Sequence, residues 1–265
     1  MKILIMILLM FSISFAKVYY AKVEPYEVRE ISSNVSGEVI YANENLVGTT
    51  LSKEPYIRIY SDVDSKELKY IKDKLEYMRE IISANEGVLD NLEKSLNKKR
   101  ENYKKVESLK FKSSVEKDRE FYDLISSENL YLNTQKEINN LKIQITDMKL
   151  REVQLQKILE DKNLTAEGFV LYDMLVKPGQ VVGVATPLAK VADVSKAKLI
   201  IFLDEPDVLN AEKKTVYIDG EKTSYKVSRL LNIADSTNIS KYMAQIILKS
   251  PKIFSRLVKV ELKND

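Results

Sequence analysis

The chain has 265 residues, 45% of them hydrophobic and 31% charged, which is the composition of a folded protein of one or two domains. Lys and Arg total 42 against 39 Asp and Glu, and a net charge of +3 is too even to indicate nucleic acid as the main partner. The sequence contains neither Cys nor His. That excludes disulfides, thiolate or imidazole metal sites, and catalytic centres built on either side chain. We therefore expect a protein that is not an enzyme and that holds no cofactor and no metal.

The first 16 residues are typical of a secretory signal peptide. A single Lys precedes an apolar stretch, and Ser14 and Ala16 supply small residues at the third and first positions before a cleavage point. The alternative is a membrane anchor, but the apolar stretch is shorter than the ~20 residues that cross a bilayer as a helix. We expect cleavage after Ala16 and export of a mature chain, beginning at Lys17, to the periplasm.

Pro and Gly are sparse in the middle of the chain. No Pro lies between Pro55 and Pro178, and only Gly87 and Gly168 interrupt the same stretch. Because Pro breaks helix interiors and Gly weakens them, this stretch favours long helices. The segments on either side of it predict short strands and turns, for example GEVIYA and PYIRIY before it and KLIIFL and LVKVEL after it.

Apolar residues in the central stretch recur every seven residues in two rows. The first run has Leu68, Leu75, Ile82, Leu89, Leu96 and Tyr103 in one row and Ile71, Met78, Asn85, Leu92, Lys99 and Val106 in the other. The second run has Leu124, Tyr131, Ile138, Ile145 and Leu159 in one row and Leu141, Met148 and Leu155 in the other, with Ser127, Thr134 and Glu152 as exceptions. A sustained 3.5-residue period predicts a coiled coil.

Two runs of similar length, joined near the polar segment 112–114, predict an antiparallel helical hairpin. The alternative is one continuous rod that dimerises in parallel. Lys110 and Lys117 occupy the positions that would have to be apolar if the register ran on from Tyr103 to Leu124. The sequence therefore favours the hairpin.

Similar β segments lie on the two sides of the predicted hairpin. Gly37 and Gly48 match Gly168 and Gly179 at an offset of 131 residues, and Pro55 matches Pro187 at an offset of 132. The glycines suit turns or bulges that need a positive φ or a close backbone approach. This internal repeat predicts two halves of one small β domain, with the hairpin inserted between them.

The order of these elements resembles that of periplasmic adaptors of the HlyD type, also called membrane fusion proteins. The resemblance is carried by segments 21–39, 176–193 and 198–218, and it covers nearly the whole mature chain. It implies an elongated α+β chain in which a long antiparallel coiled-coil hairpin is inserted into a split lipoyl-like β domain, followed by a β-barrel domain. The implied divisions are a signal peptide at 1–16, N-terminal strands and the first lipoyl-like half at 17–64, the hairpin at 65–160, the second half at 161–195 and the barrel at 196–265.

In this family the hairpin tip meets an outer-membrane channel. Many members carry Arg, then Leu four residues on, then Ser seven residues further, and the ungapped placement here gives Asn102, Val106 and Ser113. The resemblance therefore implies a docking tip made by Asn102, Val106, Leu109, Phe111 and Ser113. Ser113 also suits a helix N-cap, because Glu116 follows three residues later, and both roles stay open. Residues 94–119 carry a net charge of +6, which suits a solvated face or attraction to an acidic channel rim.

The resemblance also implies the partners. They are an inner-membrane transporter of the ABC or RND type, an outer-membrane channel of the TolC type, and further copies of the chain in a hexamer or a trimer of dimers. An exported coiled-coil scaffold or adhesin is the alternative, since it needs the heptads but not the repeat. A lipoyl-type carrier component is disfavoured, because the turn that would carry a modified lysine is replaced by the hairpin and Lys177 lies inside the second half.

Overall fold

The computed structural model describes residues 17–234 and 240–264. The expected signal peptide lies outside the described residues. The chain forms two compact units, one made by the segments up to residue 57 and from residue 165 onward, and the other by residues 58–164. Each unit is described in turn.

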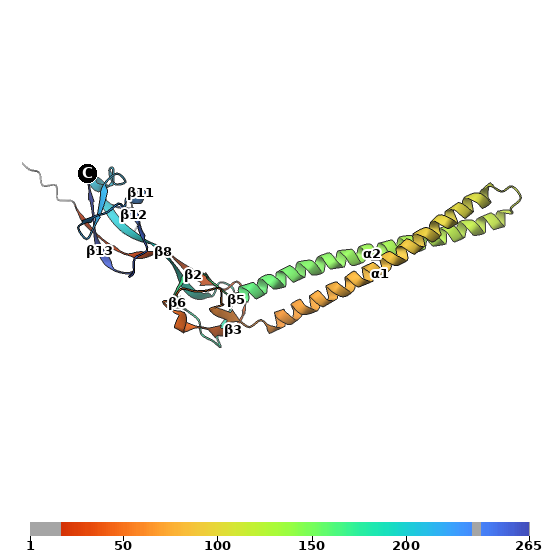
Figure 1. The fold of residues 1–265 in the computed structure, drawn as a ribbon, viewed down its shortest axis with the longest axis horizontal. Coiled ribbons are helices and arrows are strands. Elements are labelled where there is room, and N and C mark those ends of the chain that lie inside the picture. The colour runs from red at the N-terminus through yellow and green to blue at the C-terminus, as the bar shows by residue number, and fades with distance from the viewer. Residues whose placement is uncertain (1–16, 235–239, 265) are drawn as a thin grey trace, which may run out of the picture. The chain divides into compact units, whose positions relative to one another are not determined.

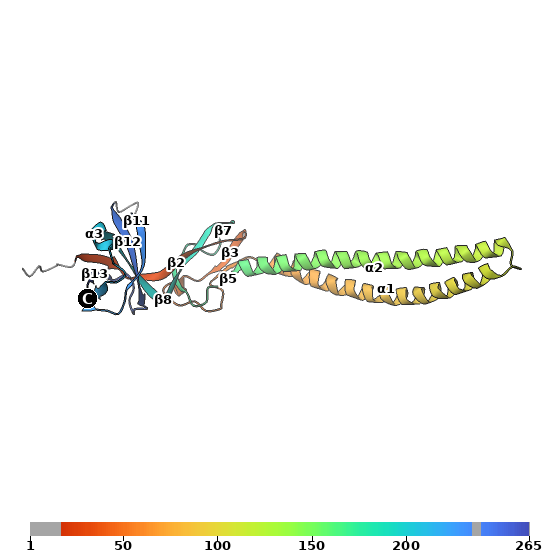
Figure 2. The ribbon, with the colours of Figure 1, turned by 90° about the horizontal axis from the view of Figure 1, so that it is seen from above.

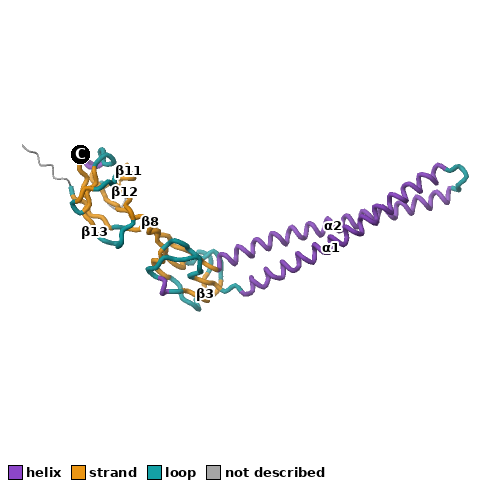
Figure 3. The backbone as a smooth tube through the Cα atoms, in the orientation of Figure 1, coloured by secondary structure: helices purple, strands orange, loops and turns teal. Residues whose placement is uncertain are grey.

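The second unit is a helical hairpin. Helix α1 (Asp62–Ser108) and helix α2 (Ser114–Lys162) run side by side in both views and are joined by a short loop (Figures 1, 2 and 3). In sequence the short strands β4 (Ile57–Ile59) and β5 (Asn163–Leu164) flank them. No helix of the described part of the chain is long and apolar enough to span a bilayer.

The seam between the two helices is the one that the heptads predict. Every seam position named above, the polar exceptions included, is buried or half-buried. The fully buried ones are Leu75, Met78, Ile82 and Leu96 on α1 and Ser127, Ile138 and Leu155 on α2. The antiparallel coiled coil is thus confirmed.

Ion pairs between the helices fix their register. Glu67 meets Arg151 at 2.7 Å and Glu86 meets Lys142 at 3.2 Å, on opposite sides of the seam, and Asp64 pairs with Lys162 at the open end of the hairpin. Exposed pairs of this kind add only ~0.2–1 kcal/mol each. Their main effect is to disfavour sliding of one helix along the other.

In the first unit, the two halves of the repeat pair with each other. Their strands are β2 (Glu24–Ser32) and β3 (Gly37–Ala42), with a 3-10 turn η1 (Glu44–Leu46), from the first half, and β6 (Val170–Met174), β7 (Val181–Val182) and the start of β8 (Pro187–Asp204) from the second. Gly37 pairs with Val182, and Gly168 donates its N–H to the Leu51 carbonyl at 3.1 Å. The offset of 131 converts the first contact into the second, so the repeat appears in the structure as a pseudo-twofold exchange.

The remaining strands form a β-barrel-like domain. They are β1 (Val18–Lys22), β9 (Thr215–Ile218), β10 (Glu221–Lys222), β11 (Val227–Ala234), β12 (Lys241–Lys249) and β13 (Leu257–Lys263), with the short helix α3 (Glu205–Val208). One sheet has the order β1-β13-β9-β10. The other has the order β11-β12-β8-β2, with β6 also pairing β8.

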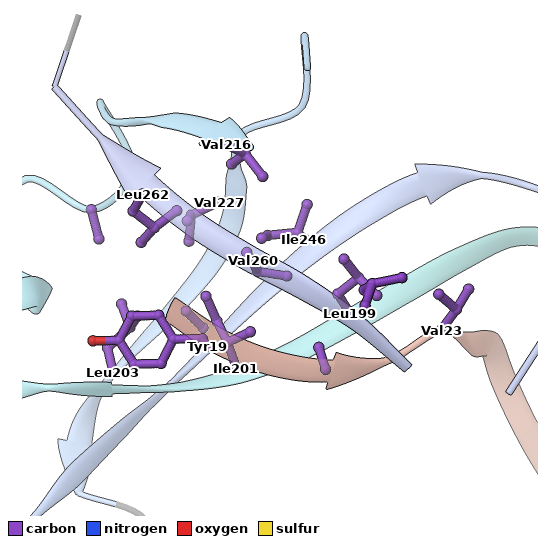
Figure 4. Close-up of a cluster of buried hydrophobic side chains, with 14 of the residues drawn as sticks. Tyr19, Val23, Leu199, Ile201, Leu203, Val216, Val227, Ile246, Val260 and Leu262 are labelled. Atoms are coloured by element: carbon purple, nitrogen blue, oxygen red, sulfur yellow. The ribbon is translucent and has the colours of Figure 1, made fainter. Parts of the chain in front are cut away.

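Strand β8 joins the barrel-like domain to the lipoyl-like halves. Its first part pairs with β2 and β6, and its last part, from Lys196 to Asp204, pairs with β12. Alternate β8 residues from Ala197 to Leu203 face the barrel core, because side chains alternate between the two faces of a strand. Figure 4 shows this core, in which Leu199 and Ile201 lie among side chains of the other sheet such as Tyr19 and Val260.

Candidate docking site at the hairpin tip

The tip is the turn over residues 109–113, and its backbone is closed from both helices. Leu109, the C-cap of α1, donates its N–H to the Val106 carbonyl at 3.2 Å. Lys117 of α2 reaches across the turn and donates from its Nζ to the Glu107 carbonyl at 2.9 Å. A cation at a helix C-terminus also interacts favourably with the helix dipole. The turn is therefore held in one geometry by contacts between the two arms.

Ser113 is the N-cap of α2 and forms a complete capping box with Glu116. Its hydroxyl accepts from the Glu116 N–H at 3.3 Å, while its own N–H donates to Glu116 Oε2 at 3.1 Å. Lys112 pairs with the same carboxylate at 3.0 Å. The hydrogen bond from Lys112, followed by those from Ser113, lowers the pKa of Glu116 below its ordinary value. The structure thus gives Ser113 the capping role that Glu116 predicted.

The expected docking residues differ in exposure. Phe111 and Val115 are the most exposed apolar side chains of the tip, at 79% and 75%. Val106 and Leu109 are half-buried, and Asn102 is exposed on α1 one turn below them. Val115 was not singled out from the sequence, although a valine outside the heptad rows next to a predicted N-cap was a usable signal. Phe111 and Val115 together form the apolar surface of the tip.

The tip also carries positive charge that the hairpin itself does not neutralise. Lys99 and Arg100 pair with Asp123 and Glu128 of α2, at 2.9 and 2.7 Å. Within the described residues no ion pair is formed by Lys98, Lys104, Lys105, Lys110 or Arg119. Apolar side chains surrounded by unpaired cations suit a partner surface that is apolar at its centre and acidic around it.

The four glycines singled out in the repeat lie in the first unit, away from the tip in sequence. Gly48, Gly168 and Gly179 have φ values of +84°, +84° and +90°, whereas Gly37, with φ 159°, begins β3. No heavy atom lies within 4 Å of a Cβ built on Gly168 or Gly179. Their requirement for glycine is therefore the backbone conformation and not space. These residues shape the β halves and form no ligand site.

The described residues do not bring together a metal-binding group. Among them, no cluster of three or more acidic side chains is placed to hold an ion. The chemistry of the tip is that of a binding surface.

Comparison with known proteins gives a result only at the level of structure. No protein-family model matches the sequence, and no curated protein matches it either. Solved structures do match. MacA from Actinobacillus actinomycetemcomitans superposes with a TM-score of 0.69 at 17% identity, over 93% of this chain and 78% of that one. The membrane fusion protein Spr0693 from Streptococcus pneumoniae R6 gives a TM-score of 0.59 at 11% identity, over 94% and 100% of the two chains.

The chain has the fold of the membrane fusion proteins. A MacA–MexA chimera that carries the Pseudomonas aeruginosa MexA α-hairpin domain is also similar, with a TM-score of 0.57 at 14% identity over 94% of this chain and 82% of that one. The membrane fusion protein fold confirms the expected α+β architecture, with its long hairpin and β-rich domains. At these identities the likeness extends to the fold alone.

Proposed function

We propose that this protein is a periplasmic adaptor that links an inner-membrane efflux or secretion transporter to an outer-membrane channel of the TolC type. The transporter would be of the ABC or RND class. The protein would be exported by a cleaved signal peptide, hold no cofactor, and associate with the membranes through its partners. It acts as a structural link and not as an enzyme.

The observation that carries this proposal is the construction of the tip. Each helix is long enough to hold a contact surface about 70 Å from the β domains, at 1.5 Å per residue. The tip is closed by the capping box and by Lys117, and it presents Phe111 and Val115 to solvent. A rigid apolar knob with a basic rim favours docking, because little conformational entropy is lost when it is buried.

Channel capture tests the proposal. Because the chain has no Cys, a single Lys110→Cys variant can carry a photo-crosslinker on the tip without disturbing the cap at Ser113. In intact cells we expect it to capture an outer-membrane channel, whereas Lys94→Cys, lower on the same arm, captures none. An exported and folded Lys110→Cys variant that captures only its own copies would favour the exported coiled-coil scaffold instead.

A further inference from the structure

Helix α1 carries a second apolar row that the hairpin seam does not use. Its members are spaced by seven or four residues and are all exposed. They are Val63, Tyr70, Tyr77, Ile81 and Val88, here named the α1 stripe. Residues four and seven apart lie on one face of a helix. A row of large apolar side chains in water over several turns indicates a surface that another protein covers.

Helix α2 carries a shorter apolar row of the same kind. Ile143, Leu150 and Val153, here named the α2 stripe, are each about 60% exposed, and their spacings of seven and three also place them on one face. In the heptads of α2 they occupy outer positions, away from the seam residues Leu141, Ile145 and Met148. The hairpin therefore has one unpartnered apolar row on each arm.

The two stripes lie at the same level of the hairpin. The ion pairs Glu67–Arg151 and Glu86–Lys142 join the arms at two heights. Tyr70, Tyr77 and Ile81 lie between those heights on α1, as do Ile143 and Leu150 on α2. Two hairpins standing parallel and side by side would thus bring the α1 stripe of one to the height of the α2 stripe of the other.

The stripes lie on different sides of the hairpin. Ile81 and Val88 follow Glu67 by two and three heptads, so they lie on the side where Glu67 meets Arg151. Lys149 follows Lys142 by one heptad and lies toward the other side, where Lys142 meets Glu86, and Val153 is four residues beyond it. Because the two rows point in different directions, one hairpin can contact one neighbour through α1 and another through α2.

The charges beside the two stripes are complementary. Asp73 and Glu80 each follow a stripe tyrosine by three residues on α1, and Lys149 lies between Ile143 and Val153 on α2. None of the three forms an ion pair or side-chain hydrogen bond within the described residues. In the parallel arrangement Lys149 falls between the heights of Asp73 and Glu80. Each unpaired charge would gain a partner of opposite sign there.

We propose that the hairpins of neighbouring copies pack side by side and in parallel, with the α1 stripe of one copy on the α2 stripe of the next and Lys149 between Asp73 and Glu80. The surfaces differ, so the contact is heterologous and generates a ring or an open row, not a closed twofold dimer. It ends near Val88, because the α1 row continues toward the tip with Lys98 and Lys105. This inference deepens the proposed function, since it names the surface through which an adaptor would assemble with its own copies.

Mixing two single-cysteine variants of the full chain tests the pairing. We expect Tyr77→Cys and Leu150→Cys proteins, mixed and treated with a short bis-maleimide, to form a covalent heterodimer. Each variant alone should give at least tenfold less product. Glu76→Cys, at the same height on another face of α1, is the matched control and should not react with Leu150→Cys. Efficient coupling of Tyr77→Cys with itself, or equal coupling by the Glu76→Cys control, would overturn the proposal.

Charge exchange gives an independent test. Glu80→Lys or Lys149→Glu should each lower the heterodimer yield severalfold, and the two changes together in one chain should restore it. All variants should keep the helical content of the parent by circular dichroism. Failure of the double variant to recover would overturn the pairing. Loss of cross-linking with intact channel capture at Lys110→Cys refutes only this inference, whereas the reverse result refutes only the proposed function.

Discussion

Gly168 donates its backbone N–H to the Leu51 carbonyl at 3.1 Å, across the two halves of the split β domain. The equivalent pair, Gly37 with Val182, makes the same kind of contact on the other side of the pseudo-twofold exchange. More than one hundred residues of hairpin separate the partners in each pair. The β domain therefore forms only when both ends of the hairpin have come together.

The glycine turns of the second half provide the first prediction. Gly179 has φ +90°, so Gly179→Val should destabilise the β domain by about 2 kcal/mol, because a β-branched residue is strained there. Urea unfolding followed through the β signal would measure this. Gly183→Ala is the matched control, since Gly183 has no positive φ and its Cβ would meet only ordinary contacts at 4.0 Å. Equal stability of the two variants would refute the backbone argument.

Ser113 allows capping to be separated from partner contact. Ser113→Ala should destabilise the hairpin by about 1 kcal/mol, because the Glu116 N–H loses its acceptor. Ser113→Asp keeps an N-cap oxygen and should restore most of that stability in thermal unfolding. If Ser113→Asp recovers stability but not channel capture, the hydroxyl itself contacts the partner. If it recovers both, capping is the whole role of Ser113.

The capping box should respond to acid. The folded-state pKa of Glu116 is lowered, first by Lys112 and then by Ser113. Its stabilising contribution is therefore fully present above the ordinary carboxyl pKa of the unfolded chain and is lost as the pH falls through the lower folded value. An NMR titration of the Glu116 carboxyl carbon would measure the shift. Lys112→Gln should move this pKa back upward, and an unchanged value would contradict the assigned cause.

Asn85 occupies a seam position, and its buried Nδ2 has no hydrogen-bond partner among the described residues. Asn85→Leu should therefore stabilise the hairpin by about 1 kcal/mol, because an unsatisfied buried donor is removed and apolar contact is added. Thermal unfolding of the helices would show it. Asn97→Leu, on an exposed face of α1, should change stability by less than about 0.5 kcal/mol. A destabilised Asn85→Leu hairpin would mean that the amide has a partner outside the described residues.

The exposed apolar side chains of the tip are expected to contribute binding and little stability. Phe111→Asp and Val115→Asp should each weaken channel capture about tenfold, or 1.4 kcal/mol, without lowering the thermal midpoint. Tyr122→Asp, which changes an exposed aromatic residue of α2 below the tip, is the control for a general loss of apolar surface. Undiminished capture by Phe111→Asp would remove the apolar knob from the proposed contact.

Local sequence patterns predicted most of the hairpin. Heptad spacing depends only on residues close in the chain, and it identified the seam even where Asn85, Lys99 and Glu152 interrupt it. The repeat was predicted less accurately. The sequence matches Val39 with Val170, yet the fully buried residues are Val39 and Leu171. A register shift in the pairing of β6 with β8 lies next to Leu171 and accounts for the slip of one residue.

The sequence by itself determined the helices, the turn between them, the cap at Ser113 and the presence of two related β halves, because each leaves a periodic or short-range signal. Only the tertiary structure decided which side chains stay in water. Val115 at the tip and the stripes at Tyr77 and Leu150 are exposed because the heptad rows are satisfied by the other arm. Their exposure depends on how the two arms meet, and such contacts between distant residues leave no pattern within a single segment of the chain.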